Sequence, residues 1–333
     1  MFGSDGSDPK VMVEAISLLP TLPEEQSTIF ISNYARISEL NETERPASDA
    51  TNAEAEAYLS SIFSPPSDEE AGAVAGDWFT GADVDAFRDE LGFSVLDVDL
   101  LVETGPGPGF MRLALGNFDE QQVSEATAAD AVWSDLLEEV EYEGETYLSW
   151  GADPEQDSGE ATAARPLGIG GRLWLQEDRG IWTHETSAME SAISAATGDG
   201  AKLIDDPSYL EVATTLDAKG AYNAILVRGP SAAGLLEGSD AEILAVGESF
   251  ADGTFHDLLI VVAPNEDRAP EIAAGLEDTL KEGRSVRTER EWADLFVQCE
   301  ASSEGSIVVV DCEMSGQPVF REALFSQDLP LLP

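Results

Sequence analysis

Residues 294–312 read DLFVQCEASSEGSIVVVDC, and this stretch contains both cysteines of the chain. Two apolar runs flank Gly305-Ser306, a pair typical of the two-residue type II′ turn of a β-hairpin, in which glycine takes the first position. With that turn Glu304 faces Ile307, and counting outward brings Cys299 opposite Cys312. Opposite residues in the non-hydrogen-bonded register lie within reach of a disulfide. The stretch therefore predicts a bridge and an oxidising compartment, whereas a slipped turn would leave two buried thiols.

A second hairpin is predicted earlier in the chain, from strands 172–177 and 181–184 around Asp178-Arg179-Gly180. Both hairpins contain a Leu-x-x-Gln spacing, which is Leu173 to Gln176 in one and Leu295 to Gln298 in the other. Similar segments precede each hairpin and a helix closes it, so the pattern predicts an internal duplication. The matched segments are 28–36 with 221–228, 110–115 with 257–262, 121–127 with 266–280, and 187–198 with 319–327.

Hairpins mixed with helices, without regular strand-helix-strand alternation, favour an α+β fold. We predict two tandem related lobes with mainly antiparallel sheets covered by helices. Residues 11–202 form the first lobe, with an insertion at 41–108 rich in Ala, Glu, Ser, Asp and Pro, and residues 203–333 form the second. The small polar residues at 1–10 predict a flexible N-terminal tether. A chain of 333 residues is long enough for each lobe to bury its own core.

The charge of the chain is extreme, with 66 Asp and Glu against 17 Lys and Arg and a formal net charge of -49. A hydrophobic fraction of 43%, arranged in periodic runs, indicates a folded protein. The acid excess and the shortage of lysine are typical of halophilic adaptation, because salt screens self-repulsion; an acidic exported protein at ordinary salt is the alternative. Nucleic acid and anionic membranes are poor partners for such a surface, and cations or basic proteins are better ones.

The sequence also bears on location. No stretch approaches the ~18 apolar residues that a membrane span requires, and no charged-then-apolar signal sequence opens the chain. Residues 2–9 have the composition of a small polar tether that follows a processed export or lipid-anchor site, although a cloning remnant would look the same. Together with the predicted disulfide, this segment favours an extracellular or cell-envelope location, with a lipid anchor as one option.

Several phrases resemble exported or lipid-anchored bacterial proteins of unknown function. They are the Leu-Pro opening at 19–23, the phrase LGFSVLDVD at 91–99, the GNFD helix entry at 116–119 and the Leu-x-Asp-Asp-Pro segment at 203–207. The chain departs from this pattern at Lys202, where a small hydroxyl residue is expected. The resemblance implies a surface location and brings no known catalytic residues.

Catalytic signatures are absent from the sequence. The two histidines, His184 and His256, have no metal-binding spacing, and no Gly-x-Ser-x-Gly motif occurs. The glycine-rich stretches at 105–109 and 168–171 match neither a phosphate loop nor a dinucleotide fingerprint. Paired carboxylates are so common that they say nothing about acid-base catalysis. We therefore predict no catalytic, cofactor-binding or metal-binding residues, and no cofactor beyond solvent cations.

Aromatic residues offer one candidate for a ligand site. Of the six tryptophans, Trp174 and Trp182 lie in the same predicted hairpin. Depending on the register, the two rings lie on one sheet face and line an aromatic groove, or they pack into the core.

The sequence thus favours a non-enzymatic, exported or lipid-anchored binding or structural protein that engages a protein or cell-surface component. The alternatives are a secreted hydrolase that acts on surface polymers through carboxylates, and a subunit of an extracellular surface assembly.

Halophilic adaptation is directly testable. We expect the thermal unfolding midpoint to rise from low salt to molar salt, because the Debye length shortens to roughly 3 Å at 1 M. Melts followed by circular dichroism over a series of NaCl and KCl concentrations measure this dependence. A midpoint that stays flat over the series contradicts the adaptation.

Overall fold

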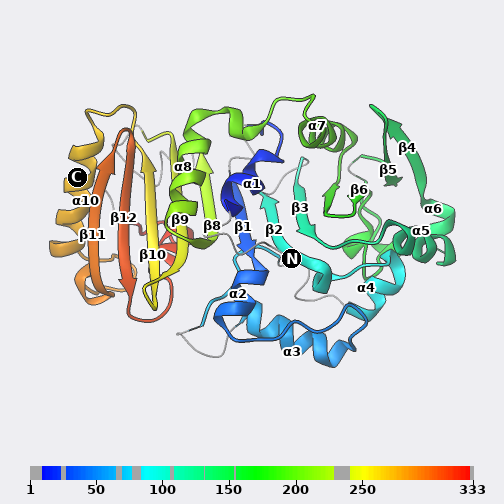
Figure 1. Ribbon diagram of the computed structural model, residues 1–333, viewed down its shortest axis with the longest axis horizontal. Coiled ribbons are helices and arrows are strands. Elements are labelled where there is room, and N and C mark those ends of the chain that lie inside the picture. Colours follow the sequence, from blue (N-terminus) through cyan, green and yellow to red (C-terminus); the bar gives the residue numbers. More distant parts are fainter. Residues whose placement is uncertain are drawn as a thin grey trace. The chain divides into compact units, whose positions relative to one another are not determined.

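A computed structural model describes residues 10–23, 28–64, 70–76, 84–105, 109–130, 132–153, 155–228 and 241–330. Residues 1–9 of the predicted tether and parts of the predicted insertion lie outside these ranges. Within them, ten helices combine with twelve strands, and the strand pairs are antiparallel. The chain therefore has the α+β fold that the sequence predicts (Figure 1).

The chain divides into two compact units. Unit 1 contains residues 1–17, 27–29 and 202–333, and unit 2 contains residues 18–26 and 30–201. The division after residue 201 lies next to the predicted lobe boundary, but helix α1 (Val11–Ser17) belongs to unit 1. The reason is a side chain of unit 1, since Asp217 accepts hydrogen bonds from the backbone N–H groups of Met12 (2.8 Å) and Val13 (3.0 Å) at the start of α1.

Unit 1 has five complete strands in the described residues, in the hydrogen-bonded order β11-β12-β10-β9-β8. Its strands are β8 (Ala221–Arg228), β9 (Ile243–Ala251), β10 (Thr254–Val262), β11 (Phe296–Glu304) and β12 (Ile307–Met314). Besides α1, the α-helices of its described residues are α8 (Pro207–Ala218), α10 (Ala269–Glu282) and α11 (Val319–Phe325). Strands β8 to β10 are buried along almost their whole length, whereas most residues of β11 are exposed.

Unit 2 carries the order β1-β2-β3-β7-β6-β5-β4, with β1 (Thr28–Asn33) beginning in unit 1 and ending in unit 2. The other strands are β2 (Val98–Thr104), β3 (Met111–Gly116), β4 (Glu138–Tyr142), β5 (Glu145–Trp150), β6 (Gly171–Gln176) and β7 (Arg179–Thr183). The helices are α2 (Tyr34–Leu40), α3 (Asn52–Phe63), α4 (Val84–Leu91), α5 (Glu120–Ala129), α6 (Trp133–Leu136) and α7 (Thr186–Thr197).

The two units repeat one order of elements. In unit 1, strands β8, β9 and β10 are followed by α10, the hairpin β11–β12 and α11, and β12 pairs with β10. In unit 2, β1, β2 and β3 are followed by α5, the hairpin β6–β7 and α7, and β7 pairs with β3. Unit 2 differs by the helices α2, α3 and α4 between β1 and β2, by α6, and by one additional hairpin, β4–β5, which pairs with the outer edge of β6. An origin of this order in a duplication of the chain stays a prediction.

The hairpin at the C-terminal end has the predicted register. Glu304 faces Ile307 and Cys299 faces Cys312, and these two cysteines form a disulfide with a Cα–Cα distance of 4.1 Å. Gly305 has a φ of +56°, the left-handed value that the first position of a type II′ turn requires. The turn chemistry was therefore sufficient to align the two strands.

Other expectations need correction. The Leu-x-x-Gln spacings do not occupy equivalent places, because Gln176 ends β6 directly before its turn, whereas Leu295 precedes β11 and Gln298 lies near its start. Strand β2 lies within the predicted insertion 41–108 and pairs with β3, so this part of the segment belongs to the sheet. The β4–β5 hairpin was not predicted at all.

Candidate functional site

The sheet of unit 1 has two differently covered faces. A Cβ at Gly247 would lie 2.8 Å from the side chain of Leu216 on α8, so the face of Gly247 is the face that α8 covers. Residues that lie directly opposite one another on neighbouring strands point to the same face of a sheet. Leu258, Asp311 and Glu300, which follow Gly247 in the strand register, therefore also point to the α8 face. Helix α8 contacts β8, β9 and β10, while β12 and β11 extend beyond it (Figure 1).

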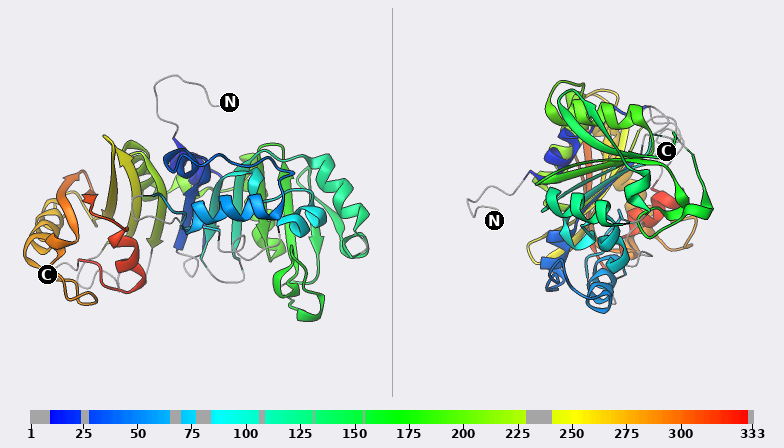
Figure 2. Two further views of the ribbon diagram at one scale, coloured as in Figure 1. Left: turned by 90° about the horizontal axis from the view of Figure 1, so that it is seen from below. Right: turned by 90° about the vertical axis from the view of Figure 1, so that its right-hand side faces the viewer.

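The opposite face is covered by the other two helices. Helix α10 contacts β11 and β12, and α11 contacts β9 and β10. Figure 2 shows α10 in orange and α11 in red on the same side of these strands. Val308, Val310 and Cys312, which point to this face, are fully buried. Only the α8 face of β11 and β12 is therefore open to a ligand.

A groove lies on this open face, between α8 and the β11–β12 hairpin. Its first part is a hollow of about 730 Å³. Apolar atoms come from Leu210, Ala218, Ile307 and Val309, and they form much of the lining together with Thr214. The second part, of about 490 Å³, shares the lining residues Lys219 and Ser302 with the first. We call the two parts together the α8 groove.

The charge along the α8 groove is mainly negative. Its acidic lining residues are Glu211, Glu300, Glu304, Asp311 and Glu313, and its basic ones are Lys219 and His256. The basic groups are already engaged, because Lys219 Nζ lies 2.8 Å and His256 Nδ1 lies 2.7 Å from the Asp311 carboxylate.

Asp311, Lys219 and His256 form a cluster, which we call the Asp311 cluster, and its contacts favour the ionised form of the Asp311 carboxylate. Burial alone raises the pKa of Asp311, but the hydrogen bonds and charges of Lys219 and His256 outweigh burial and lower the pKa below its ordinary value. Asp311 thus balances the charge of Lys219 in this part of the groove. In the part of the chain that the structure describes, Glu300 and Glu304 have no recorded side-chain partner and are exposed.

Two contacts join α8 and the residue after it to the hairpin. Ser306 in the turn donates a hydrogen bond to Glu211 (3.0 Å), and Lys219, which lines both hollows, contacts Asp311. The disulfide ties β11 to β12 beside the second hollow, where Cys299 contributes to the lining. The predicted pair Cys299 and Cys312 therefore holds the outer strand of the groove in register.

A pair of buried carboxylates lies on the opposite face. Glu248 and Asp257 face one another on β9 and β10, and Arg321 of α11 lies 2.9 Å from Glu248. Asp257 accepts hydrogen bonds from the first backbone N–H groups of α11, on Val319 (2.6 Å) and Phe320 (2.7 Å). Desolvation raises the pKa of Asp257 to about 8, and burial also raises the pKa of Glu248. This pair holds α11 on the sheet and is almost completely buried.

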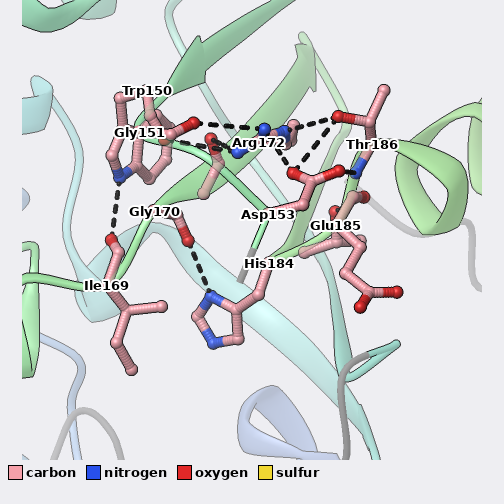
Figure 3. Close-up of polar contacts among 11 residues, drawn as sticks. Trp150, Gly151, Asp153, Ile169, Gly170, Arg172, His184, Glu185 and Thr186 are labelled. Carbon is pink, nitrogen blue, oxygen red and sulfur yellow. Dashed lines mark hydrogen bonds and ion pairs between the residues drawn. The ribbon is translucent and has the colours of Figure 1, made fainter. Parts of the chain in front are cut away.

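Unit 2 contains a second polar cluster, drawn in Figure 3. The buried Arg172 donates to the carbonyls of Trp150 (3.2 Å) and Gly151 (3.2 Å) and to the Thr186 hydroxyl (3.0 Å), and it pairs with Asp153. Asp153 in turn accepts from the backbone N–H of Thr186 at the start of α7 (3.0 Å). These contacts tie the residues after β5 to α7, so we interpret the cluster as structural.

The tryptophans of the predicted groove do not share a surface. Trp174 faces Ile181 and Trp182 faces Leu173, which places the two indoles on opposite faces of the sheet. Both are buried. Trp182 packs edge-on against Trp150, with ring centroids 5.2 Å apart, and Trp174 donates its indole N–H to Glu145 (3.1 Å). Both rings are thus part of the core, the second of the two interpretations.

The histidines lie in different units and have different surroundings. His184 Nδ1 lies 3.2 Å from the Gly170 carbonyl, and burial lowers the pKa of this imidazole (Figure 3). His256 belongs to the Asp311 cluster. Among the described residues, no group of three or more His, Cys, Asp or Glu side chains is arranged to hold a metal ion.

Sequence reasoning missed the residues that matter most here. Glu248 and Asp257 interrupt strongly apolar strands, a signal that points to buried carboxylates. Lys219, one of four lysines in the chain, follows α8 directly and could have been singled out by its rarity. No sequence pattern indicated the α8 groove, because the groove lies where no helix covers the sheet.

Comparisons with known proteins give no family. No family model matches the chain, and no curated protein matches it. Among solved structures, crystal form I of the treponemal protein TP0453 aligns with a TM-score of 0.41 at 9% identity, covering 97% of this chain and 99% of that one. Crystal form III of TP0453 aligns with a TM-score of 0.44 at 8% identity, covering 93% of this chain and 97% of that one.

Within the described residues, no helix has the length and apolar character needed to cross a bilayer.

The buried Asp257 makes stability depend on pH. Its folded pKa of about 8 lies above the ordinary 3.8, so between these values the folded state holds a proton that the unfolded state has released. Raising the pH through this window therefore lowers the free energy of unfolding. We expect Asp257→Asn, which cannot ionise and keeps an acceptor for the α11 amides, to lose less stability than the wild type over this window in urea titrations.

The exposed Asp278 on α10 provides the control, because Asp278→Asn removes a carboxylate that water already solvates. That variant should keep the wild-type slope of unfolding free energy against pH. An unchanged slope in Asp257→Asn would show that the folded state does not retain this proton.

Proposed function

We propose that this protein is an exported, non-catalytic binding protein that captures a cationic segment of a protein or cell-surface partner in the α8 groove. The observation that carries the proposal is the open, acid-lined face of β11 and β12, where Glu300 and Glu304 are exposed beside an apolar floor. Lysine and arginine side chains suit this combination, since their alkyl stems cover apolar surface while their charged ends remain at its rim.

The net charge of the chain supports a cationic partner. A charge of -49 attracts cations over a distance of about a Debye length and accelerates their encounter with the surface. The long-range field does not choose a site, because carboxylates cover the whole chain. Specific binding of a cationic partner therefore has to come from the groove, where acidic side chains, an apolar floor and a strand held by a disulfide occur together.

The proposal also includes a location outside the reducing cytosol, in the cell envelope or beyond it, with a lipid anchor as one means of attachment. The Cys299–Cys312 disulfide supports this location, because structural disulfides persist mainly in oxidising compartments. The excess of carboxylates supports salt-rich surroundings, in which a weakly bound partner is held by the apolar part of the groove.

The proposal predicts a local charge effect on binding. We expect the double variant Glu300→Gln with Glu304→Gln to bind a fluorescent oligolysine peptide roughly three- to tenfold more weakly in an anisotropy titration, since each exposed ion pair contributes a few tenths to one kcal/mol. Thr214→Trp, which fills the first hollow and leaves the charge unchanged, should weaken binding as well.

The matched control is Glu139→Gln with Glu141→Gln, two exposed acids of strand β4 in unit 2. It changes the net charge by the same amount and should leave the affinity within about twofold of wild type. Equal weakening by both double variants would mean that the peptide follows the overall charge and has no site in the groove.

A further inference from the structure

Strand β11 is the terminal strand in the order of unit 1. Among the described residues it pairs only with β12, so one of its edges has no strand beside it. An edge of this kind presents a row of backbone donors and acceptors that another extended chain can use. The residues from 297 to 304 are exposed or half-buried, and α10, which also contacts β11, packs on the face opposite to α8.

The register tells which backbone groups point to the free edge. Glu304 and Ile307 flank a two-residue turn and form a hydrogen-bonded pair, so the pairs alternate from there along the hairpin. Cys299, Ala301 and Ser303 fall at the non-hydrogen-bonded places, and their N–H and C=O groups point away from β12. The side chains of Glu300, Ser302 and Glu304 point to the α8 face.

Unit 2 shows which kind of segment pairs with the corresponding edge of the repeated sheet. In unit 2 the strand equivalent to β11 is β6, and its outer edge pairs with β5, with Leu148 opposite Leu173 and Trp150 opposite Gly171. The hairpin β4–β5 thus fills in unit 2 the position that is empty beside β11 in the described part of unit 1. An antiparallel strand therefore fits this edge of the repeated sheet.

We propose that β11 accepts an extended, cationic peptide segment of a partner protein as an added antiparallel strand. The added strand lies beyond β11, beside the α8 groove, and its basic side chains point to the α8 face next to Glu300 and Glu304. The proposal rests on the proposed function and specifies how the partner is recognised. Basic residues at positions i and i+4 of the segment lie opposite Glu304 and Glu300, and a small residue at i+2 lies opposite Ser302. Opposite charges on directly facing residues stabilise such a pairing.

Charge selects this occupant over a second copy of the chain. Pairing of β11 with another β11 would bring Glu300 and Glu304 of one copy close to the same residues of the other. The exposed β4 edge of unit 2 carries Glu138, Glu139 and Glu141 and offers no better match. Like charges that face one another across strands are destabilising.

Backbone pairing is tested with N-methylated peptides. The probe is a fluorescent peptide with the core Lys-Val-Thr-Val-Lys, which in the proposed register directs the valine N–H groups toward β11. N-methylation of both valines should weaken binding about tenfold, because two backbone hydrogen bonds are lost. N-methylation of both lysines, whose N–H groups point away, should leave the affinity nearly unchanged. Equal effects of the two modifications would overturn strand addition.

A variant of the protein tests the same contact from the other side. Ala301→Pro removes a backbone N–H that does not pair with β12, and proline is tolerated on edge strands where its N–H side faces solvent. We expect the variant to keep the wild-type circular dichroism spectrum and disulfide and to bind the unmodified peptide about tenfold more weakly. Ala301→Val, a strand-forming residue with its N–H intact, is the control and should bind like wild type.

The outcomes separate this inference from the proposed function. If the peptide binds, and loses affinity in the Glu300→Gln with Glu304→Gln variant but responds neither to valine N-methylation nor to Ala301→Pro, the groove binds cations and strand addition is wrong. If the peptide does not bind at all, both proposals fail. Light scattering could instead show dimers that form without peptide and that are absent in the Ala301→Pro variant. That result would place a second copy of the chain at this edge and would also overturn the inference.

Discussion

The register of the β11–β12 hairpin determines which side chains reach each face of its two strands and which backbone groups of β11 point to the free edge. The Gly305-Ser306 turn fixes the register and the disulfide between Cys299 and Cys312 holds it. Once it is fixed, one set of side chains turns to α10 and the core, and the other turns to the α8 face. The same alternation directs every second backbone amide of β11 to the free edge. A slip by one residue would exchange the two sets and remove both the acidic lining and the disulfide.

The protein uses its carboxylates in three different environments. Asp257 and Glu248 are buried, and there the cost of desolvation favours the protonated form, although Asp257 still accepts the hydrogen bonds from the α11 amides that anchor this helix. Asp311 is half-buried, and its charge is retained because Lys219 and His256 contact it. Glu300 and Glu304 are exposed, and water solvates their charge. Of these three environments, the last leaves a charge available to a partner, which is why the proposed function lies on the open side of the sheet.

The sequence predicted what local chemistry determines. The turn at Gly305-Ser306 and the spacing of the two cysteines were sufficient for the hairpin and its disulfide, and the mixture of hairpins and helices was sufficient for the α+β class. Strand β4 escaped prediction because its acidic residues lack the apolar alternation of a half-buried strand. The groove could not be predicted, since it depends on where α8 ends and on the missing neighbour of β11. Lys219 and Asp311 are 92 residues apart, and only the fold brings them together.

Residue-resolved amide hydrogen exchange by NMR, with and without the Lys-Val-Thr-Val-Lys peptide, tests whether β11 accepts an added strand. We expect the amides of Cys299, Ala301 and Ser303 to exchange fast in the free protein while those of Glu300 and Ser302 exchange slowly. Saturating peptide should protect the first group. Protection of Ala301 and Ser303 before any peptide is added, or exchange of these amides that stays fast at saturation, would contradict this expectation.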